Sequence, residues 1–139
     1  MLTNTELKQI EELISEGEKR TSGEIRVHID NTCEIDPYQR GVQIFHELKM
    51  QETKERNGIL IYLDFSHRKL AIIGDIGIHE KVESEFWEKT KEELINEFKS
   101  SNFLNGVCNS VKILSEKLVA FFPSSDSDSN ELSNEVTTA

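Results

Sequence analysis

The spacing of apolar residues changes twice in the first half of the chain. A capping box of Thr3 and Glu6 opens a stretch with helical periodicity. Strict alternation over residues 24–30 then predicts a half-buried strand, apolar on one side and polar on the other. Asp36 and Pro37 predict the start of a second helix, with Asp36 as its N-cap. This half of the chain therefore predicts the order helix, strand, helix.

The second half begins with two apolar runs that are separated by only a few polar residues. Residues 59–65 and 69–74 predict strands covered on both faces, and no helix fits between them, so they are expected to form a hairpin. Residues 80–99 predict a long helix, and residues 103–122 predict a last helix that Pro123 stops. The whole order predicts an α/β domain with a small mixed sheet flanked by helices on both faces.

The residues after Pro123 have a different composition. Residues 124–139 are rich in Ser, Asp, Asn and Thr, and Leu132 and Val136 are their only sizeable apolar residues. Such a segment buries too little apolar surface to offset the chain entropy that ordering costs. We therefore expect a domain over residues 1–123 and a disordered acidic C-terminal tail over residues 124–139.

Three side chains have expected environments that bear on function. Tyr38 falls on the apolar face of the second predicted helix, and Trp87, at helical spacing beside Phe86, is expected to belong to the core. His28 lies on the polar side of its strand and is expected to be exposed.

Charge limits the class of partner. The 139 residues carry a net charge of −10, which repels nucleic acid and anionic membranes but suits a cation or a basic partner. No basic segment followed by an apolar stretch marks a signal peptide, and no run approaches the roughly 20 apolar residues that span a bilayer. The sequence predicts a soluble, cytoplasmic protein without membrane insertion, in which Cys33 and Cys108 are free thiols.

Four blocks, in this order, resemble the TPM domain family, which comprises thylakoid-lumen proteins of photosystem repair and many bacterial relatives. They are SGEIRVHI at residues 22–29, RNGILIYL at 56–63, RKLAIIGDIGI at 68–78 and FFP at 121–123. The resemblance covers roughly residues 3–123. It implies a three-layer α/β/α sandwich with a groove at one end of the sheet. It also implies calcium binding, which is described for plant and bacterial members, and acid phosphatase activity, which is described for some plant members.

Five carboxylates form the candidate metal site. Asp30 ends the first strand, Glu34 and Asp36 follow in its loop, Asp75 ends the second strand of the hairpin, and Glu80 comes close behind. If the strands lie near each other, as the family fold implies, these side chains surround one crevice. Several oxygen ligands without a nearby Cys or paired His suit Ca²⁺, or Mg²⁺, better than zinc. Ordinary roles compete, since Asp36 is explained as an N-cap and Glu80 by the dipole of the helix expected to start there.

The favoured function is therefore a calcium-binding module without catalysis of its own, because the sequence holds none of the common catalytic motifs. One alternative is a metal-assisted acid phosphatase, in which Asp75 and Asp36 hold the metal and His79 donates a proton. A second alternative is an interaction domain that captures a basic protein partner with its negative surface.

Overall fold

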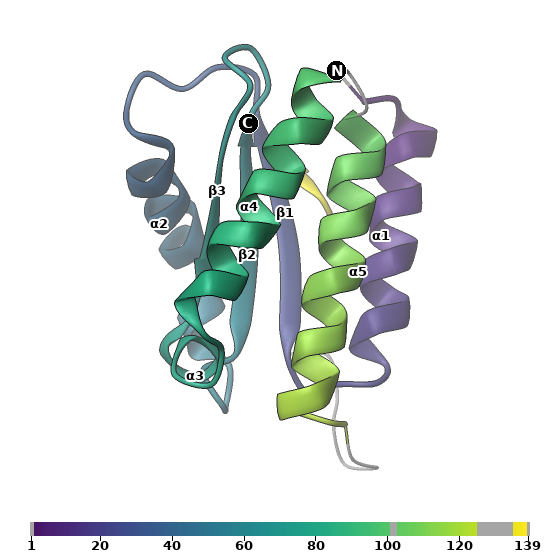
Figure 1. Cartoon of the computed structure of the whole chain (residues 1–139), viewed down its shortest axis with the longest axis vertical. Helices are drawn as coiled ribbons and strands as arrows, with labels where there is room; N and C mark the ends of the chain where they lie inside the picture. The colour runs from purple at the N-terminus through teal and green to yellow at the C-terminus, as the bar shows by residue number, and fades with distance from the viewer. Residues whose placement is uncertain (1, 101–102, 125–134, 139) are drawn as a thin grey trace.

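The computed structural model, which describes residues 2–100, 103–124 and 135–138, has a four-stranded mixed sheet at its centre (Figure 1). Its strands are β1 (Glu24–Asp30), β2 (Gly58–Asp64), β3 (Lys69–Gly74) and β4 (Thr137–Thr138). The spatial order is β3-β2-β1-β4. β1 pairs in parallel with both β2 and β4, whereas β2 and β3 form the predicted antiparallel hairpin.

Helices cover both faces of this sheet. One face carries the main core, which is built from α1 (Asn4–Glu18), α4 (Ser84–Lys99) and α5 (Phe103–Phe121). On the other face α2 (Pro37–Glu47) and the short 3-10 helix η1 (Met50–Glu52) enclose a second, smaller core. The three-layer α/β/α sandwich is therefore confirmed (Figure 1). Among the described helices, none is long and apolar enough to cross a membrane.

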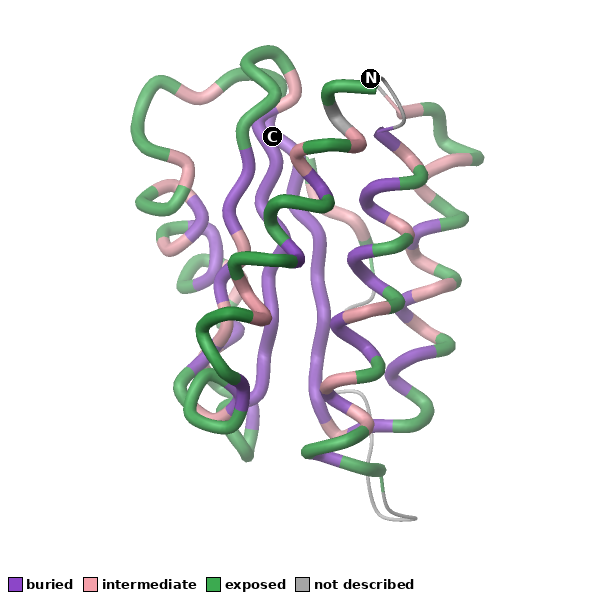
Figure 2. The backbone as a smooth tube through the Cα atoms, viewed as in Figure 1, coloured by how far each residue is buried: buried purple, intermediate pink, exposed green. Residues whose placement is uncertain are grey.

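β1 is buried along its whole length, on its polar side as well as its apolar side (Figure 2). The prediction of a half-buried strand is wrong here, and so is the expected exposure of His28, which keeps only 5% of its surface. β1 lies between β2 and β4, and the four side chains of its polar row are only 1–7% exposed. Burial of such side chains is tolerated where they have polar partners, as Asp30 has in Tyr62 and Arg40.

The helix predicted for residues 80–99 is two helices. A short helix, α3 (Ile76–His79), follows β3 directly, and α4 begins only at Ser84. Asp75 causes the early start, because its side chain accepts a hydrogen bond from the backbone N–H of Ile76 and caps α3. Glu80 consequently ends the short helix instead of beginning the long one.

The C-terminal segment forms a strand where none was predicted. Thr137 and Thr138 form β4 and pair with His28 and Ile29 of β1. Pairing of this kind uses backbone groups and suits β-branched threonine, so it needs none of the apolar surface that the segment lacks. The prediction of disorder for residues 125–134 and 139 falls outside the described part of the chain.

Gly77 marks a close approach that only glycine permits. Its backbone N–H donates to the carbonyl oxygen of Arg56 over 2.7 Å, and a Cβ atom here would overlap the carbonyl oxygens of Glu55 and Arg56. The start of α3 therefore packs against backbone that cannot move aside.

We expect Gly77→Ala to lower the free energy of unfolding by about 1–3 kcal/mol, because relief of this overlap must shift backbone. Gly41→Ala is the matched control. A Cβ there would lie 3.1 Å from Cγ1 of Ile73, a side chain that can adjust, and alanine gains about 1 kcal/mol of helix propensity. Urea unfolding of both variants measures the difference, and equal stabilities would contradict the assigned role of Gly77.

Candidate functional site

The structure separates the five predicted metal ligands instead of gathering them. In the parallel pair Asp30 lies beside Asp64 at the end of β2, whereas in the hairpin Gly74 lies beside Ile59 near the start of β2. Asp75 therefore emerges at the opposite end of the sheet from Asp30, about 20 Å away for a strand of seven residues. The expectation of a single crevice is wrong. The predicted order of elements already indicated this separation. A helix between β1 and β2 favours a parallel pair, and a hairpin then turns β3 in the opposite direction.

Asp30 is held by its neighbours on three sides. Its carboxylate accepts hydrogen bonds from Tyr62 Oη at 2.6 Å and Arg40 Nε at 3.0 Å, and it lies 2.8 Å from His28 Nε2. Burial alone would raise the pKa of Asp30, but the hydrogen bonds from Tyr62, Arg40 and His28 together outweigh it and lower the pKa. The carboxylate thus serves as the acceptor for a buried polar cluster.

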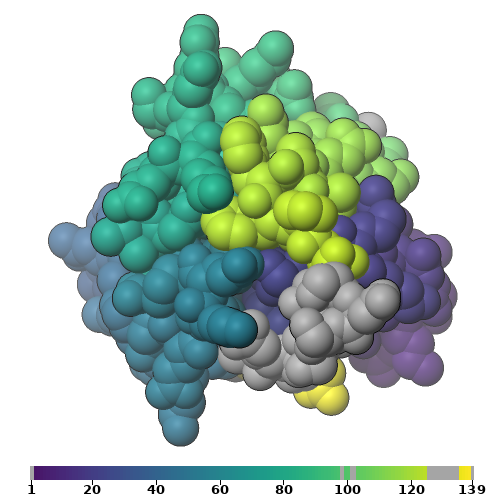
Figure 3. All heavy atoms as spheres, turned by 90° about the horizontal axis from the view of Figure 1, so that it is seen from below, coloured from purple at the N-terminus to yellow at the C-terminus, as the bar shows by residue number. Residues whose placement is uncertain are grey.

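Asp75 is also engaged by the protein. Arg56 donates to it through Nε at 2.7 Å and Nη2 at 2.8 Å, in a two-pronged ion pair, while the backbone of Ile76 donates to the same carboxylate. Figure 3 views this end of the molecule, where the segment before β2 (blue) lies against the segment after β3 (teal). Asp75 therefore links the segment before β2 to the start of α3.

The other three predicted ligands lie at the surface. Asp36 caps α2 as predicted, accepting from the backbone N–H of Gln39 over 3.1 Å, and Glu34 is exposed in the loop before it. Glu80 is exposed at the end of α3. In the described part of the chain, no three His, Cys, Asp or Glu side chains are grouped so that they could hold a metal ion. The donor set predicted from the sequence does not fit one calcium site.

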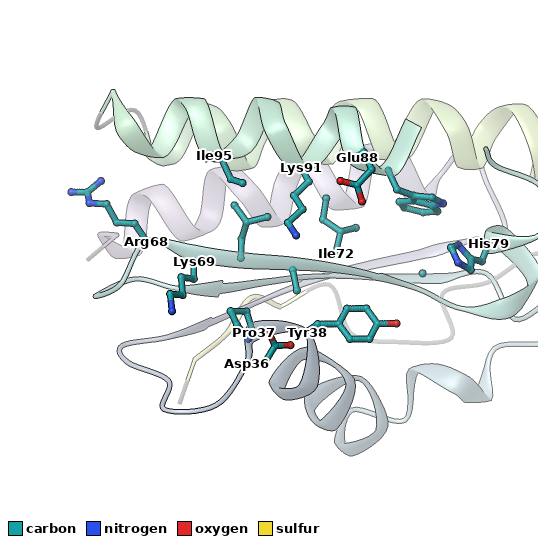
Figure 4. A pocket seen from close by; sticks show the side chains of 14 residues that line it. Asp36, Pro37, Tyr38, Arg68, Lys69, Ile72, His79, Glu88, Lys91 and Ile95 are labelled. Carbon is teal, nitrogen blue, oxygen red and sulfur yellow. The ribbon is translucent and has the colours of Figure 1, made fainter. Parts of the chain in front are cut away.

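A groove of about 590 Å³ lies elsewhere, along β3 and between α2 and α4 (Figure 4). β3 is the edge strand of the sheet, and its outer side pairs with no strand in the region that the structure describes. α2 contributes Tyr38 to one wall, and α4 contributes Trp87 and Lys91 to the other. The groove thus follows the outer edge of a strand, between two helical walls.

The two ends of the groove differ in chemistry (Figure 4). Arg68 and Lys69 lie at the end where β3 begins, and Lys91 reaches in from α4 nearer the middle of the groove, beside Glu88. His79 lies at the other end, with its ring centroid 5.9 Å from that of Trp87. The groove is therefore cationic at one end and aromatic at the other.

Two aromatic residues of the groove depart from their predicted places. Tyr38 was expected to face inward, but it is 59% exposed and lines the groove from the first turn of α2. Trp87 was expected in the core; it packs against the main core but remains half-buried and lines the groove. Helical spacing predicted which face of each helix is apolar. It could not predict which residues of that face lie beside the groove and not over the core.

A pair of buried carboxylates was not predicted at all. Glu18, at the end of α1, is 6% exposed, and Glu24, at the start of β1, is 1% exposed. Burial and then the neighbouring Glu24 raise the pKa of Glu18 to about 9, so that Glu18 is protonated at neutral pH and hydrogen-bonds to Glu24. Its other role is local, since Oε2 of Glu18 accepts from the backbone N–H of Ile25 at 3.0 Å.

Comparison with known proteins agrees with this architecture. A family model for the TPM domain matches residues 1–117. The solution NMR structure of the BA42 protein, from the psychrophilic bacterium Bizionia argentinensis, is 39% identical in sequence. It superimposes with a TM-score of 0.93, over 100% of this chain and 96% of that one. A comparison with curated proteins gave no match.

The mixed sheet with helices on both faces and the four sequence blocks define an α/β/α sandwich of the TPM type. The chain belongs to the TPM domain family.

The Glu18–Glu24 pair predicts a specific dependence of stability on pH. Between the ordinary pKa of 4.5 and a value of about 9, the folded protein binds a proton at Glu18 that the unfolded chain releases. Stability therefore falls as pH rises through this window, by up to about 1.4 kcal/mol per pH unit.

We expect Glu18→Gln to keep the hydrogen bond to Glu24 and to flatten the dependence of stability on pH between 5 and 8.5. Glu12→Gln, at an exposed position of α1, is the control and should leave the slope unchanged. Urea unfolding at a series of pH values measures both. Parallel profiles for the wild type and Glu18→Gln would show that Glu18 is ionised in the folded state.

Proposed function

We propose that this TPM domain is a protein-interaction module without catalysis, which binds an extended polypeptide segment in the groove along β3. One observation carries the proposal: the free edge of the sheet forms the floor of the groove. Backbone N–H and C=O groups on such an edge are strong donors and acceptors that an added strand can satisfy. Peptide recognition by strand addition uses this arrangement, and side-chain pockets beside the edge give it selectivity.

The dimensions and the walls of the groove support a peptide ligand. β3 has six residues and spans about 20 Å, which matches a bound segment of about six residues. The large side chain of Tyr38, which lines the groove, is 59% exposed. Exposed apolar groups beside a groove are typical of interaction surfaces.

The functions that the family resemblance implies stay predictions. Calcium would have to use the five carboxylates separately, because they share no site and Asp30 and Asp75 already have protein partners. In the phosphatase alternative Asp36 and His79 do line the groove, but Asp75, the second assigned metal ligand, is bound by Arg56 and does not. The groove favours the interaction-domain alternative, although Lys69 and Lys91 in the groove suit an acidic partner and not the basic partner expected from the net charge.

Selection from a random pool of eight-residue peptides tests the proposed function. We expect selected peptides to shift the NMR resonances of β3 and Trp87, and to slow hydrogen exchange of β3 amides as new backbone hydrogen bonds form. Tyr38→Ala should weaken binding roughly tenfold, as is typical for an exposed aromatic contact. Ile76→Ala is the matched control, since Ile76 is 55% exposed and does not line the groove. Shifts that cluster elsewhere, or equal binding by both variants, would contradict the proposal.

Titration with Ca²⁺ and Mg²⁺, followed residue by residue by NMR, tests the metal prediction. Because opposite ends of the sheet separate the two groups of carboxylates, we expect responses near Asp36 and near Asp75 to be independent. Asp75→Asn should abolish only the response at its own end. Loss of both responses in this variant would mean that a single site joins the two ends.

A further inference from the structure

Resting on the proposed function, we infer that the segment bound by the groove is an acidic strand with a defined polarity. Its carboxylates lie at the end of the groove where β3 begins, and a large apolar side chain lies at the end where β3 stops. The inference identifies the partner by its chemistry, as an extended peptide that is acidic at one end and aromatic or aliphatic at the other.

The first argument is the charge of the groove against that of the protein. Lys69, on β3, and Lys91, on α4, are exposed side chains that approach the groove from two different elements (Figure 4). Neither forms an ion pair within the described part of the chain, although the protein as a whole carries a net charge of −10. Two such cations, one where β3 begins and one near the middle of the groove, are complementary to carboxylates of a bound peptide, and such complementarity sets partner choice.

Two acidic residues also line the groove and offset part of this charge. Asp36 caps α2 by accepting a hydrogen bond from the backbone N–H of Gln39. Glu88 stands on α4 nearer the aromatic end, one turn before Lys91 (Figure 4). Arg68, in the turn before β3, adds a third positive charge to the cationic end.

The second argument is the surface at the other end of the groove. Trp87 lies across the end of β3, where a Cβ added to Gly74 would be 3.0 Å from its Cη2 atom. The half-buried Ile72 and the ring of His79 continue this surface. Because Gly74 has no side chain, the aromatic surface of Trp87 at this end of β3 is open to a ligand. Such a surface favours a large apolar side chain from the ligand.

The described end of the acidic tail of the same molecule, residues 135–138, is not the occupant. Residues 135–138 lead into β4, which pairs with β1 at the opposite edge of the sheet from β3. The tail of a second copy is a separate case, which the experiment below distinguishes.

The test uses the full chain and short peptides blocked at both ends. The probes are acetyl-Glu-Glu-Thr-Val-Thr-Phe-amide and its reversed sequence, so that both strand directions are sampled. In the matched peptides lysine replaces both glutamates. At low salt we expect at least one acidic probe to bind roughly tenfold more tightly than its lysine counterpart, with shifts confined to the groove.

Charge reversal on the protein supplies the second arm. The double variant Lys69→Glu, Lys91→Glu should prefer the lysine peptide, because the complementarity is then inverted. Lys89→Glu is the control, since Lys89 is exposed on α4 but does not line the groove. It should keep the preference of the wild type.

Each remaining outcome decides one of the two claims. Equal binding of acidic and lysine peptides in the groove would overturn the acidic partner while leaving the proposed function intact. Equal binding of a probe methylated at alternate backbone nitrogens would overturn strand addition, and hence the proposed function. Tighter binding of a peptide of residues 124–139 than of either probe would make a second copy the occupant and overturn the inference.

Discussion

The placement of every functional side chain depends on how β2 pairs with its two neighbours. β2 runs parallel to β1 on one side and antiparallel to β3 on the other, with continuous register along both. The parallel pair requires a helical connection, and α2 supplies it on one face of the sheet. The antiparallel pair sends the chain back, so that β3 ends where β1 begins. The same two pairings leave β3 without an outer neighbour among the described strands and so create the groove.

The interior of β1 shows how charge is accommodated in this fold. Part of its polar row has partners on other elements: the protonated Glu18 of α1 hydrogen-bonds to Glu24, and Arg40 of α2 pairs with Asp30. Single buried charges would be costly, whereas groups with hydrogen-bonded partners can remain. These contacts hold the end of α1 and the first turns of α2 against β1. Because α2 also forms one wall of the groove, they help to position that wall.

Much of the fold could be predicted from sequence because its signals are local. The capping box of Thr3 and Glu6, the Asp36 cap and the hairpin all depend on residues close in the chain, and the structure confirms each of them. The site could not be predicted in the same way. Asp75 was expected near Asp30 because both residues end strands, but the two strands end at opposite ends of the sheet because β3 runs antiparallel to β1. Tyr38 and Trp87 were misplaced because periodicity gives the face of a helix but not the point where that face leaves the sheet. β4 was missed because backbone pairing leaves no apolar pattern in the sequence.

The two edges of the sheet are closed to different degrees. β4 covers the edge of β1 with only two residues, held in part by a 2.7 Å contact between Nδ1 of His28 and Oγ1 of Thr137, 109 positions apart. So small a unit has few interactions to lose, and local unfolding can release it while the rest of the domain stays folded. Release would uncover a second strand edge, next to a row of charged groups and not beside aromatic walls. Among the described strands, the domain therefore combines one edge that no strand covers with one that only two residues cover.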